Sequence, residues 1–227
     1  MMDDLSDQTV RRIHRRGLPR RSKVRLSAEA QLALTMTDGI SPRRRDSHIW
    51  GREKHDHYVE PAWCSERLFA VEPFHGNVDD PCCGFGTIPE AAYRAGIGVS
   101  ASDLMDRGYA GTRIEDFFAS TWPRDNIVCN PPFTAAERFA LHALKLTACK
   151  LAIIFPTRRL NAAHWIRYTP LRRIWLLTPR PSMPPGYVVT TGRKASGGKQ
   201  DFCWLVFERG WEGPAELRWL RRDGGDR

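Results

Sequence analysis

Short apolar runs alternate with amphipathic segments through most of the chain. Residues 151–155 form an unbroken apolar run, as expected of a strand that is buried on both faces of a sheet. Residues 134–147, by contrast, place their apolar side chains at helical spacing. Strands and helices that alternate in this way indicate parallel strands joined by crossover helices. The pattern therefore predicts an α/β fold with a doubly wound, mostly parallel sheet.

The expected elements follow one another from residue 76 to residue 207, and glycine-rich or polar segments mark the turns between them. The expected strands are residues 76–80, 98–101, 125–129, 151–155, 173–177 and 202–207. The expected helices are residues 87–95, 134–147 and 161–167. A further short helix is predicted at residues 28–36, capped by Ser27 and closed by the Asp38-Gly39 turn.

Charge is distributed unevenly along the 227 residues, whose formal net charge is +9. Residues 1–45 hold 11 Lys and Arg residues but only 5 Asp and Glu residues. We expect this segment to be a basic, partly disordered N-terminal arm, which could follow phosphates or could serve only as a solubilising tail. One domain is expected at residues 46–210, followed by a C-terminal tail at residues 211–227.

A second basic region lies between Glu137 and Asp201, where the chain has no Asp or Glu but 12 Lys and Arg residues. Aromatic residues such as Trp165 and Tyr168 are interleaved with them. Basic and aromatic residues together suit a phosphate backbone with unstacked bases, so a nucleic acid is the favoured partner. An acidic small molecule or protein could use the same charge.

Part of this basic region, residues 179–200, is rich in Pro, Gly, Ser and Thr. Long segments of this composition in compact domains are usually functional or disordered, so we interpret it as a mobile substrate loop. The residues selected as substrate-binding are Arg158, Arg159, Arg193 and Lys194.

The tetrapeptide Asn130-Pro131-Pro132-Phe133 directly follows the strand expected at residues 125–129. The carboxyl ends of strands are where open α/β sheets bind ligands. The Asn side-chain oxygen and a neighbouring backbone carbonyl can accept hydrogen bonds from both N–H groups of an exocyclic amine. The prolines stiffen the loop, and Phe133 offers a face on which a base can stack. An ordinary proline-rich turn is the alternative.

A glycine-containing loop, Asp80-Pro81-Cys82-Cys83-Gly84-Phe85-Gly86-Thr87, separates the first expected strand from the first expected helix. Gly84 and Gly86 permit a tight turn and a close approach to a ligand. Asp103 follows the next strand near the offset of about 20 residues at which an acidic residue contacts ribose hydroxyls. Asp103 could also cap a helix that begins at Leu104.

In this order and 50 residues apart, the two motifs resemble the cofactor and catalytic loops of class I S-adenosylmethionine-dependent methyltransferases. The resemblance spans residues 58–207 and is strongest to the enzymes that methylate adenine N6 in DNA, including those of restriction-modification systems. It implies a Rossmann-like sheet, S-adenosylmethionine as the cofactor and a DNA base that flips out of the duplex.

The resemblance also implies roles for particular residues. The residues expected to catalyse are Asn130, Pro131, Pro132 and Phe133. Those expected to contact the cofactor are Tyr58, Pro61, Asp80, Cys82, Gly84, Gly86, Asp103, Asp116 and Phe117. Glu60 departs from the family, which more often has Thr there. Asp116 and Phe117 could instead be a capping residue and a core residue.

Four alternatives remain open for the function. The methyl group could go to cytosine N4 instead of adenine N6, the same chemistry could act on RNA or on a protein glutamine, or the chain could be a catalytically silent nucleic-acid binding module. Six cysteines without a Cys-x-x-Cys pair, and no long apolar run, lead us to expect a cytoplasmic protein with no membrane span. The spacing of its Cys and His residues matches no zinc pattern, so no metal is expected.

Overall fold

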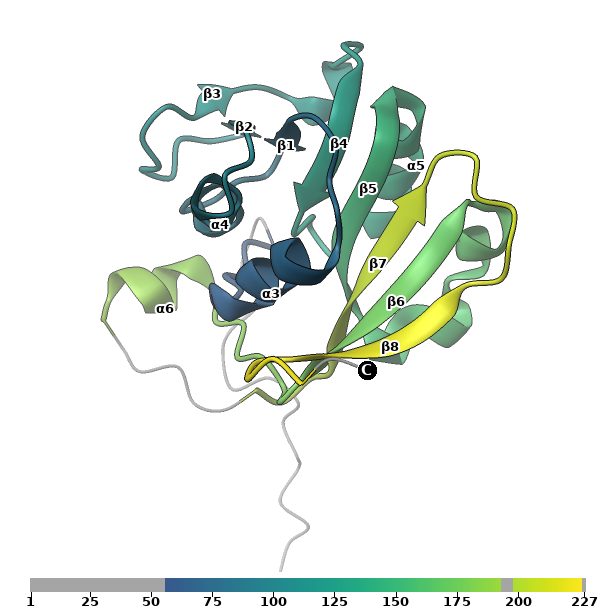
Figure 1. Cartoon of the computed structure of the whole chain (residues 1–227). Coiled ribbons are helices and arrows are strands. Elements are labelled where there is room, and N and C mark those ends of the chain that lie inside the picture. The colour runs from purple at the N-terminus through teal and green to yellow at the C-terminus, as the bar shows by residue number, and fades with distance from the viewer. Residues whose placement is uncertain (1–55, 193–197, 226–227) are drawn as a thin grey trace, which may run out of the picture. The chain divides into compact units, whose positions relative to one another are not determined.

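The computed structural model describes residues 56–192 and 198–225 (Figure 1). Within these residues, eight strands form one sheet in the order β3-β2-β1-β4-β5-β7-β6-β8. Strand β7 runs antiparallel to both of its neighbours, and the other pairs of adjacent strands are parallel. This topology confirms the predicted doubly wound, mostly parallel sheet.

The strands of the sheet vary in length from two to ten residues. Their bounds are β1 Val78–Asp80, β2 Val99–Asp103, β3 Arg113–Ile114, β4 Arg124–Cys129, β5 Thr147–Pro156, β6 Leu171–Thr178, β7 Phe202–Glu208 and β8 Glu216–Arg221. The α-helices are α3 Trp63–Val71, α4 Thr87–Arg94, α5 Ala136–Leu146 and α6 Gly186–Thr190. The 3-10 helices are η1 Phe117–Ala119, η2 Thr157–Ala162 and η3 His164–Tyr168.

Apolar side chains on the two faces of the sheet form two separate cores. In β5, Ala152 and Ile154 point into one core, whereas Leu151, Ile153 and Phe155 point into the other. Helices α3 and α4 cover the first face, and α5 covers the second. The unbroken apolar run at residues 151–155 thus has the cause that we inferred, burial on both faces. The strand extends beyond this run at both ends, over Thr147–Pro156.

The C-terminal segment differs from the expected tail, because β8 pairs with β6 at the edge of the sheet. Leu220 is fully buried there, whereas Leu217 and Trp219 are about half exposed. An isolated pattern of two or three apolar residues is too short to distinguish such an edge strand from a tail. The expected helix at residues 161–167 is also replaced, by the two short helices η2 and η3.

Several expectations fall on segments at the margins of the description. The N-terminal arm, with its helix expected at residues 28–36, lies outside the described residues. Residues 179–200 include α6, so the loop is partly helical.

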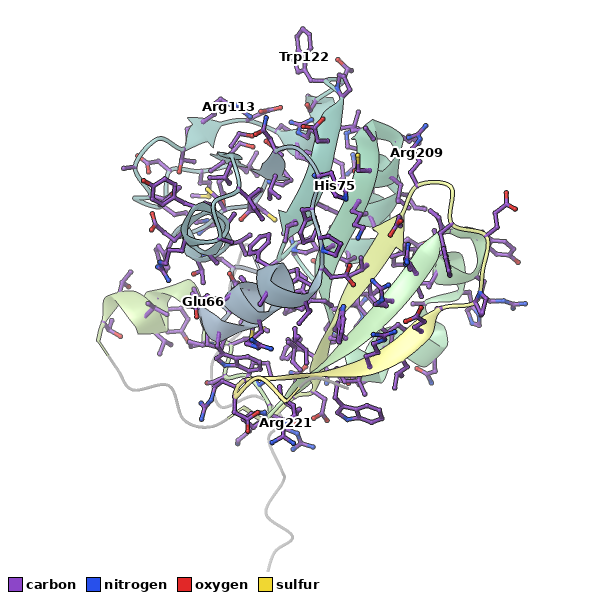
Figure 2. The ribbon with its side chains drawn as sticks, in the orientation of Figure 1. Glu66, His75, Arg113, Trp122, Arg209 and Arg221 are labelled. Carbon is purple, nitrogen blue, oxygen red and sulfur yellow. The ribbon has the colours of Figure 1, made fainter. Side chains whose placement is uncertain are left out.

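Figure 2 shows Trp122, which is 74% exposed, projecting from the loop before β4. No described helix has the length and apolar character needed to cross a bilayer.

Candidate active site

The glycine loop between β1 and α4 is shaped by its glycines and by Asp80. Gly84 and Gly86 have positive φ angles of 54° and 85°. A Cβ at Gly86 would also collide with the ring of Tyr109, so an L side chain is excluded there on two grounds. Asp80 Oδ1 accepts a hydrogen bond from the Cys82 backbone N–H at 3.1 Å. Asp80 is 1% exposed, so it holds the loop by this hydrogen bond from a buried position.

Asp103 stands at the carboxyl end of β2 and faces the same loop. Its carboxylate accepts hydrogen bonds from the backbone N–H groups of Gly84 at 3.0 Å and Met105 at 3.1 Å. The residues after Asp103 form a bend, not a helix, so the alternative of a helix cap is wrong. Through these hydrogen bonds, the Asp103 side chain instead links the loop that follows β1 to the bend that follows β2.

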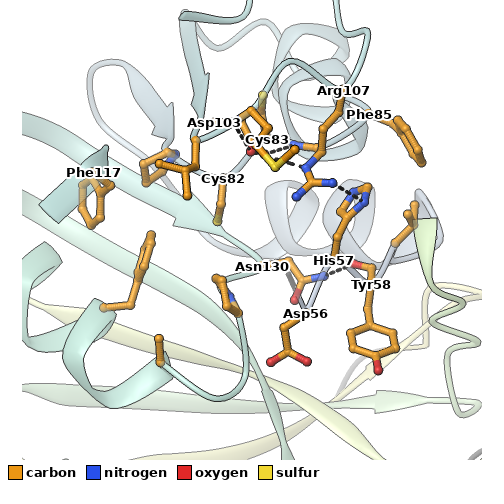
Figure 3. Close-up of a pocket in the computed structure, with 18 of the residues that line it drawn as sticks. Asp56, His57, Tyr58, Cys82, Cys83, Phe85, Asp103, Arg107, Phe117 and Asn130 are labelled. Atoms are coloured by element: carbon orange, nitrogen blue, oxygen red, sulfur yellow. Dashed lines mark hydrogen bonds and ion pairs between the residues drawn. The ribbon is translucent and has the colours of Figure 1, made fainter. Parts of the chain in front are cut away.

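A cavity of about 490 Å³ opens beside these loops, within the range of typical small-molecule sites. Its walls come from the segment before α3, the glycine loop, the residues after β2 and β3, and the loop after β4 (Figure 3). Of the predicted residues, those that line it are Tyr58, Cys82, Gly84, Asp103, Asp116, Phe117, Asn130 and Pro132. The predicted residues that support the site from outside the lining are Pro61, Asp80, Gly86, Pro131 and Phe133.

Asp116 and Phe117 have structural roles as well as a place in the cavity wall. The Asp116 side chain accepts a hydrogen bond from the Phe118 N–H at 2.9 Å and so caps η1. Phe117 is 4% exposed and stacks on Phe139, with ring centroids 4.5 Å apart. The roles of cap and core residue are therefore observed, and both residues also line the cavity.

Asn130, at the end of β4, is held in one orientation. Its Nδ2 donates to the Tyr58 carbonyl and to Glu60 Oε2, both at 2.8 Å. Turning the amide over would set its oxygen against these two acceptors, so the orientation follows from the partners themselves. Asn130 Oδ1 is buried and has no hydrogen-bond partner among the described residues. Since buried polar atoms are normally paired, this oxygen is a marked exception in a cavity wall.

Phe133 lies differently from the free stacking surface that the sequence suggested. Its ring is stacked on Tyr58, at 5.8 Å between centroids, and packs against Phe202 at 5.5 Å. Tyr58 is the member of this pair that lines the cavity. The Phe133 carbonyl also accepts a hydrogen bond from Arg159 Nη1. The aromatic residue of the loop is thus part of a small cluster at the rim.

Three residues of the site, His57, Glu60 and Arg107, were not selected from the sequence. Arg107 Nη1 donates to His57 Nδ1 at 3.1 Å, and Arg107 Nε contacts Asp103 Oδ1 at 3.4 Å. Burial, together with the charge of Arg107, lowers the pKa of His57 to about 4, so the ring is neutral at pH 7. No motif marks His57 or Arg107. Glu60 was visible only as the departure from Thr.

Two buried acidic residues of the site, Glu60 and Asp80, have pKa values above their ordinary range. Burial raises the pKa of Glu60 to about 7, against a partial lowering by its hydrogen bonds. Burial also raises the pKa of Asp80 well above its usual range, and Glu60, Asp79 and Asp103 add to that effect through their charges. Asp80 Oδ2 is buried without a hydrogen-bond partner among the described residues. Two buried side-chain oxygens, Asn130 Oδ1 in the cavity wall and Asp80 Oδ2 outside the lining, thus have no hydrogen-bond partner in the described chain.

The acid-free basic span does not form one positive face, contrary to our expectation. Arg158 and Arg159 lie in η2 at the carboxyl end of β5, exposed and close to the loop after β4. The opposite ends of the strands, near the amino ends of β5 and β6, hold Lys150, Arg172 and Arg173. There Glu72 and Glu208 form ion pairs with them. Sequence spacing could not reveal this division, because the span includes two whole strands, β5 and β6, and so reaches both ends of the strands. Arg193 and Lys194 lie outside the described residues.

Comparison with known proteins was informative only at the level of structure. No protein-family model and no curated protein matches the sequence. A proposed RNA methyltransferase from Pyrococcus horikoshii is similar, with 17% identity and a TM-score of 0.50 over 65% of this chain and 83% of that chain.

Two components of type I restriction enzymes are similar as well. The modification subunit of a proposed type I restriction enzyme from Vibrio vulnificus has 15% identity and a TM-score of 0.51, over 85% of this chain and 51% of that chain. The M protein of the type I restriction enzyme EcoKI has 14% identity and a TM-score of 0.51, over 74% of this chain and 49% of that chain. The present chain thus spans about half the length of these two proteins. Its fold is that of the class I S-adenosylmethionine-dependent methyltransferases.

Proposed function

We propose that this protein transfers a methyl group from S-adenosylmethionine to the exocyclic N6 amine of adenine in DNA. The observation that carries the proposal is the Asn130 amide, whose oxygen is buried, unpaired among the described residues and held at the cavity wall. An acceptor of this kind suits an N–H donor in the substrate. The fold and the partly acidic cavity support the choice of cofactor.

The described residues fit the cofactor in chemical terms. Asp103 and Asp116 offer carboxylate acceptors for hydroxyl and amine groups, and Gly84 allows a close approach of the backbone. Phe117 adds an apolar wall. When bound, S-adenosylmethionine supplies an electrophilic methyl group on a sulfonium.

The chain then has to position the amine and to make its lone pair available. Asn130 Oδ1 accepts one N–H of the amine, and the carbonyl of Pro131, which lies between the two lining residues Asn130 and Pro132, accepts the other. Two acceptors in fixed positions turn the nitrogen lone pair away from the ring and towards the methyl group. The Tyr58–Phe133 pair provides the aromatic surface for the base. Rate enhancement comes from positioning and preorganised hydrogen bonds, with no covalent intermediate.

A nucleic acid is favoured over a protein substrate by the position of Arg158 and Arg159. Both are exposed at the cavity side of the sheet, where phosphates of a substrate strand would pass. The two restriction-system proteins of similar fold also agree with a DNA substrate. RNA is the second candidate, because its phosphates would meet the same arginines and because the P. horikoshii protein of similar fold is a proposed RNA methyltransferase.

The experiment is to incubate the purified protein with methyl-labelled S-adenosylmethionine and with separate DNA, RNA and protein pools. We expect label in DNA. Label in RNA alone would keep the chemistry and replace the substrate, and label in protein alone would do the same for a glutamine amide. Absence of label in every pool, with DNA binding retained, would overturn the proposal in favour of a silent binding module.

A further inference from the structure

Glu60 and Asn130 share an arrangement that the sequence alone does not reveal. They are 70 positions apart in the chain, yet Glu60 Oε2 accepts a hydrogen bond from Asn130 Nδ2 at 2.8 Å. Glu60 is 7% exposed, so this contact is shielded from water.

Each of the two residues is followed by a proline, Pro61 and Pro131. A proline restricts the residue before it to extended geometry, so both backbones are fixed at the contact. Val59, just before Glu60, is held in turn because its N–H donates to the Pro184 carbonyl at 2.9 Å. Two restricted segments therefore meet at Asn130, whose Nδ2 donates to both the Tyr58 carbonyl and Glu60 Oε2.

The hydrogen bond determines where the Asn130 oxygen points. The Tyr58 carbonyl accepts one hydrogen of Nδ2, and Glu60 accepts the other. Without Glu60, one acceptor remains, and rotation about the bond to the amide would leave Oδ1 free to turn from the cavity. With both acceptors in place, Oδ1 is the one amide atom left for a ligand.

We propose that Glu60 is a positioning residue for the methyl transfer: its carboxylate locks the Asn130 amide so that Oδ1 faces the substrate amine. This inference rests on the proposed function of Asn130 and adds a residue to it. Glu60 acts through Asn130 and need not touch the substrate.

The test compares Glu60→Met with Glu60→Gln. Met keeps the length and burial of the side chain but removes the acceptor, whereas Gln keeps an oxygen that can accept from Asn130 Nδ2. We expect Glu60→Met to lower kcat by about 10²-fold, as for a small misplacement of a catalytic group, and to leave the Kd for S-adenosylmethionine and the KM for DNA within about twofold. Glu60→Gln should restore kcat to within about threefold of the wild type.

A second readout does not depend on turnover. The ¹⁵N side-chain amide resonance of Asn130, identified by its loss in Asn130→Ala, should shift in Glu60→Met and stay near its wild-type position in Glu60→Gln. Glu66→Ala is the matched control, because Glu66 is an exposed residue of the neighbouring helix α3 that pairs with Arg94. That variant should change neither kcat nor the amide resonance.

The outcomes separate the two proposals. An unshifted amide resonance in Glu60→Met, or an unchanged kcat, would overturn the positioning role while leaving the methyltransferase activity intact. A rise in the Kd for S-adenosylmethionine with unchanged kcat would also overturn it, since Glu60 would then bind the cofactor directly. A wild-type protein that transfers no methyl group would refute the proposed function, whatever the resonance does.

Discussion

An asparagine stands near each end of strand β4: Asn126 is fully buried near its amino end, and Asn130 is half-buried directly after its carboxyl end. Comparing the two separates the end of the sheet that is stabilised by saturated contacts from the end that borders the cavity. Asn126 donates to the His75 and Asn77 carbonyls, and its Oδ1 accepts from the Lys150 N–H. Asn130 also donates twice, but its oxygen is unpaired among the described residues. Only the second asparagine retains an acceptor that a ligand can use.

The glutamates beside these asparagines differ in the same way. Burial alone would raise the pKa of Glu72, but hydrogen bonds from Arg173 and Trp175 and the charge of Lys150 outweigh it and lower that pKa. Glu60 has no cationic partner in its described surroundings, and burial raises its pKa to about 7. A charge that is saturated by partners stabilises the fold, whereas an unsaturated one costs stability and indicates a function.

The largest effect is expected from Asn130→Ala. Removing the acceptor should lower kcat by about 10²–10³-fold, the usual loss for one preorganised hydrogen-bonding group in a transition state. The Kd for S-adenosylmethionine should remain near the wild-type value, measured by calorimetry. Asn126→Ala is the matched control, and in the folded protein it should leave kcat within about twofold. Equal losses of kcat in the two variants would remove the distinction between the two ends of the sheet.

Glu72→Gln should mainly affect stability. Its side chain is fully buried between Lys150 and Arg173, at 3.1 Å and 2.6 Å. Breaking a buried ion pair from one side typically costs about 3–5 kcal/mol in the free energy of unfolding. Urea denaturation of the variant measures this loss. A decrease below about 1 kcal/mol would mean that solvent screens the cluster, as at surface ion pairs.

The two glutamates should also give the stability opposite dependences on pH. The raised pKa of Glu60 means that the folded state holds the proton more tightly, so its contribution is present below about pH 4.5 and is lost as the pH rises through about 7. For Glu72, with a lowered pKa, the contribution is present above about pH 4.5 and is lost on acidification.

Urea denaturation across this pH range, for the wild type, Glu60→Gln and Glu72→Gln, measures both trends. The stability of the wild type relative to Glu60→Gln should fall by about 3 kcal/mol between about pH 4.5 and pH 8. The stability relative to Glu72→Gln should fall towards acid instead. If both stability differences changed with pH in the same direction, the assignment would be contradicted, because the folded state should favour the protonated form of Glu60 and the ionised form of Glu72.

The smallest effect concerns the basic residues at the two ends of the sheet. Arg158→Ala should reduce the slope of log K against log[salt] for DNA binding by about 1, the loss of one phosphate contact. Arg172→Ala should leave that slope unchanged, because Arg172 Nη1 contacts Glu208 Oε1 at 2.6 Å at the far end. Titrations at several salt concentrations decide the matter. A reduced slope in Arg172→Ala would place DNA at the opposite end.

The sequence predicted the sheet and its loops well because both depend on local composition. The apolar run at residues 151–155 predicts a strand that is buried on both faces, and it is buried so. The glycines at residues 84 and 86 predict a tight turn, and both have positive φ angles. Strand β8 was missed, since only Leu220 of its apolar residues is fully buried. Edge strands carry little of the alternation on which such predictions depend.

The candidate site was predicted less completely. Eight of the predicted residues line the cavity, because motif spacing places them at the carboxyl ends of successive strands. The contact between Glu60 and Asn130, and that between His57 and Arg107, join segments far apart in the chain. Periodicity contains no information on such pairs. The charge of residues 138–200 was misread for the same reason, as the partners of Lys150 and Arg173 lie outside that span.

The account is tested most directly by mass spectrometry of nucleosides from DNA that has been incubated with the protein and with S-adenosylmethionine carrying a trideuterated methyl group. We predict labelled N6-methyldeoxyadenosine with the wild type, and its loss with Asn130→Ala. Label in N4-methyldeoxycytidine would keep Asn130 as the acceptor and change the base. DNA that remains unlabelled, or labelled equally by Asn130→Ala, would contradict the central claim that the unpaired oxygen of Asn130 carries the reaction.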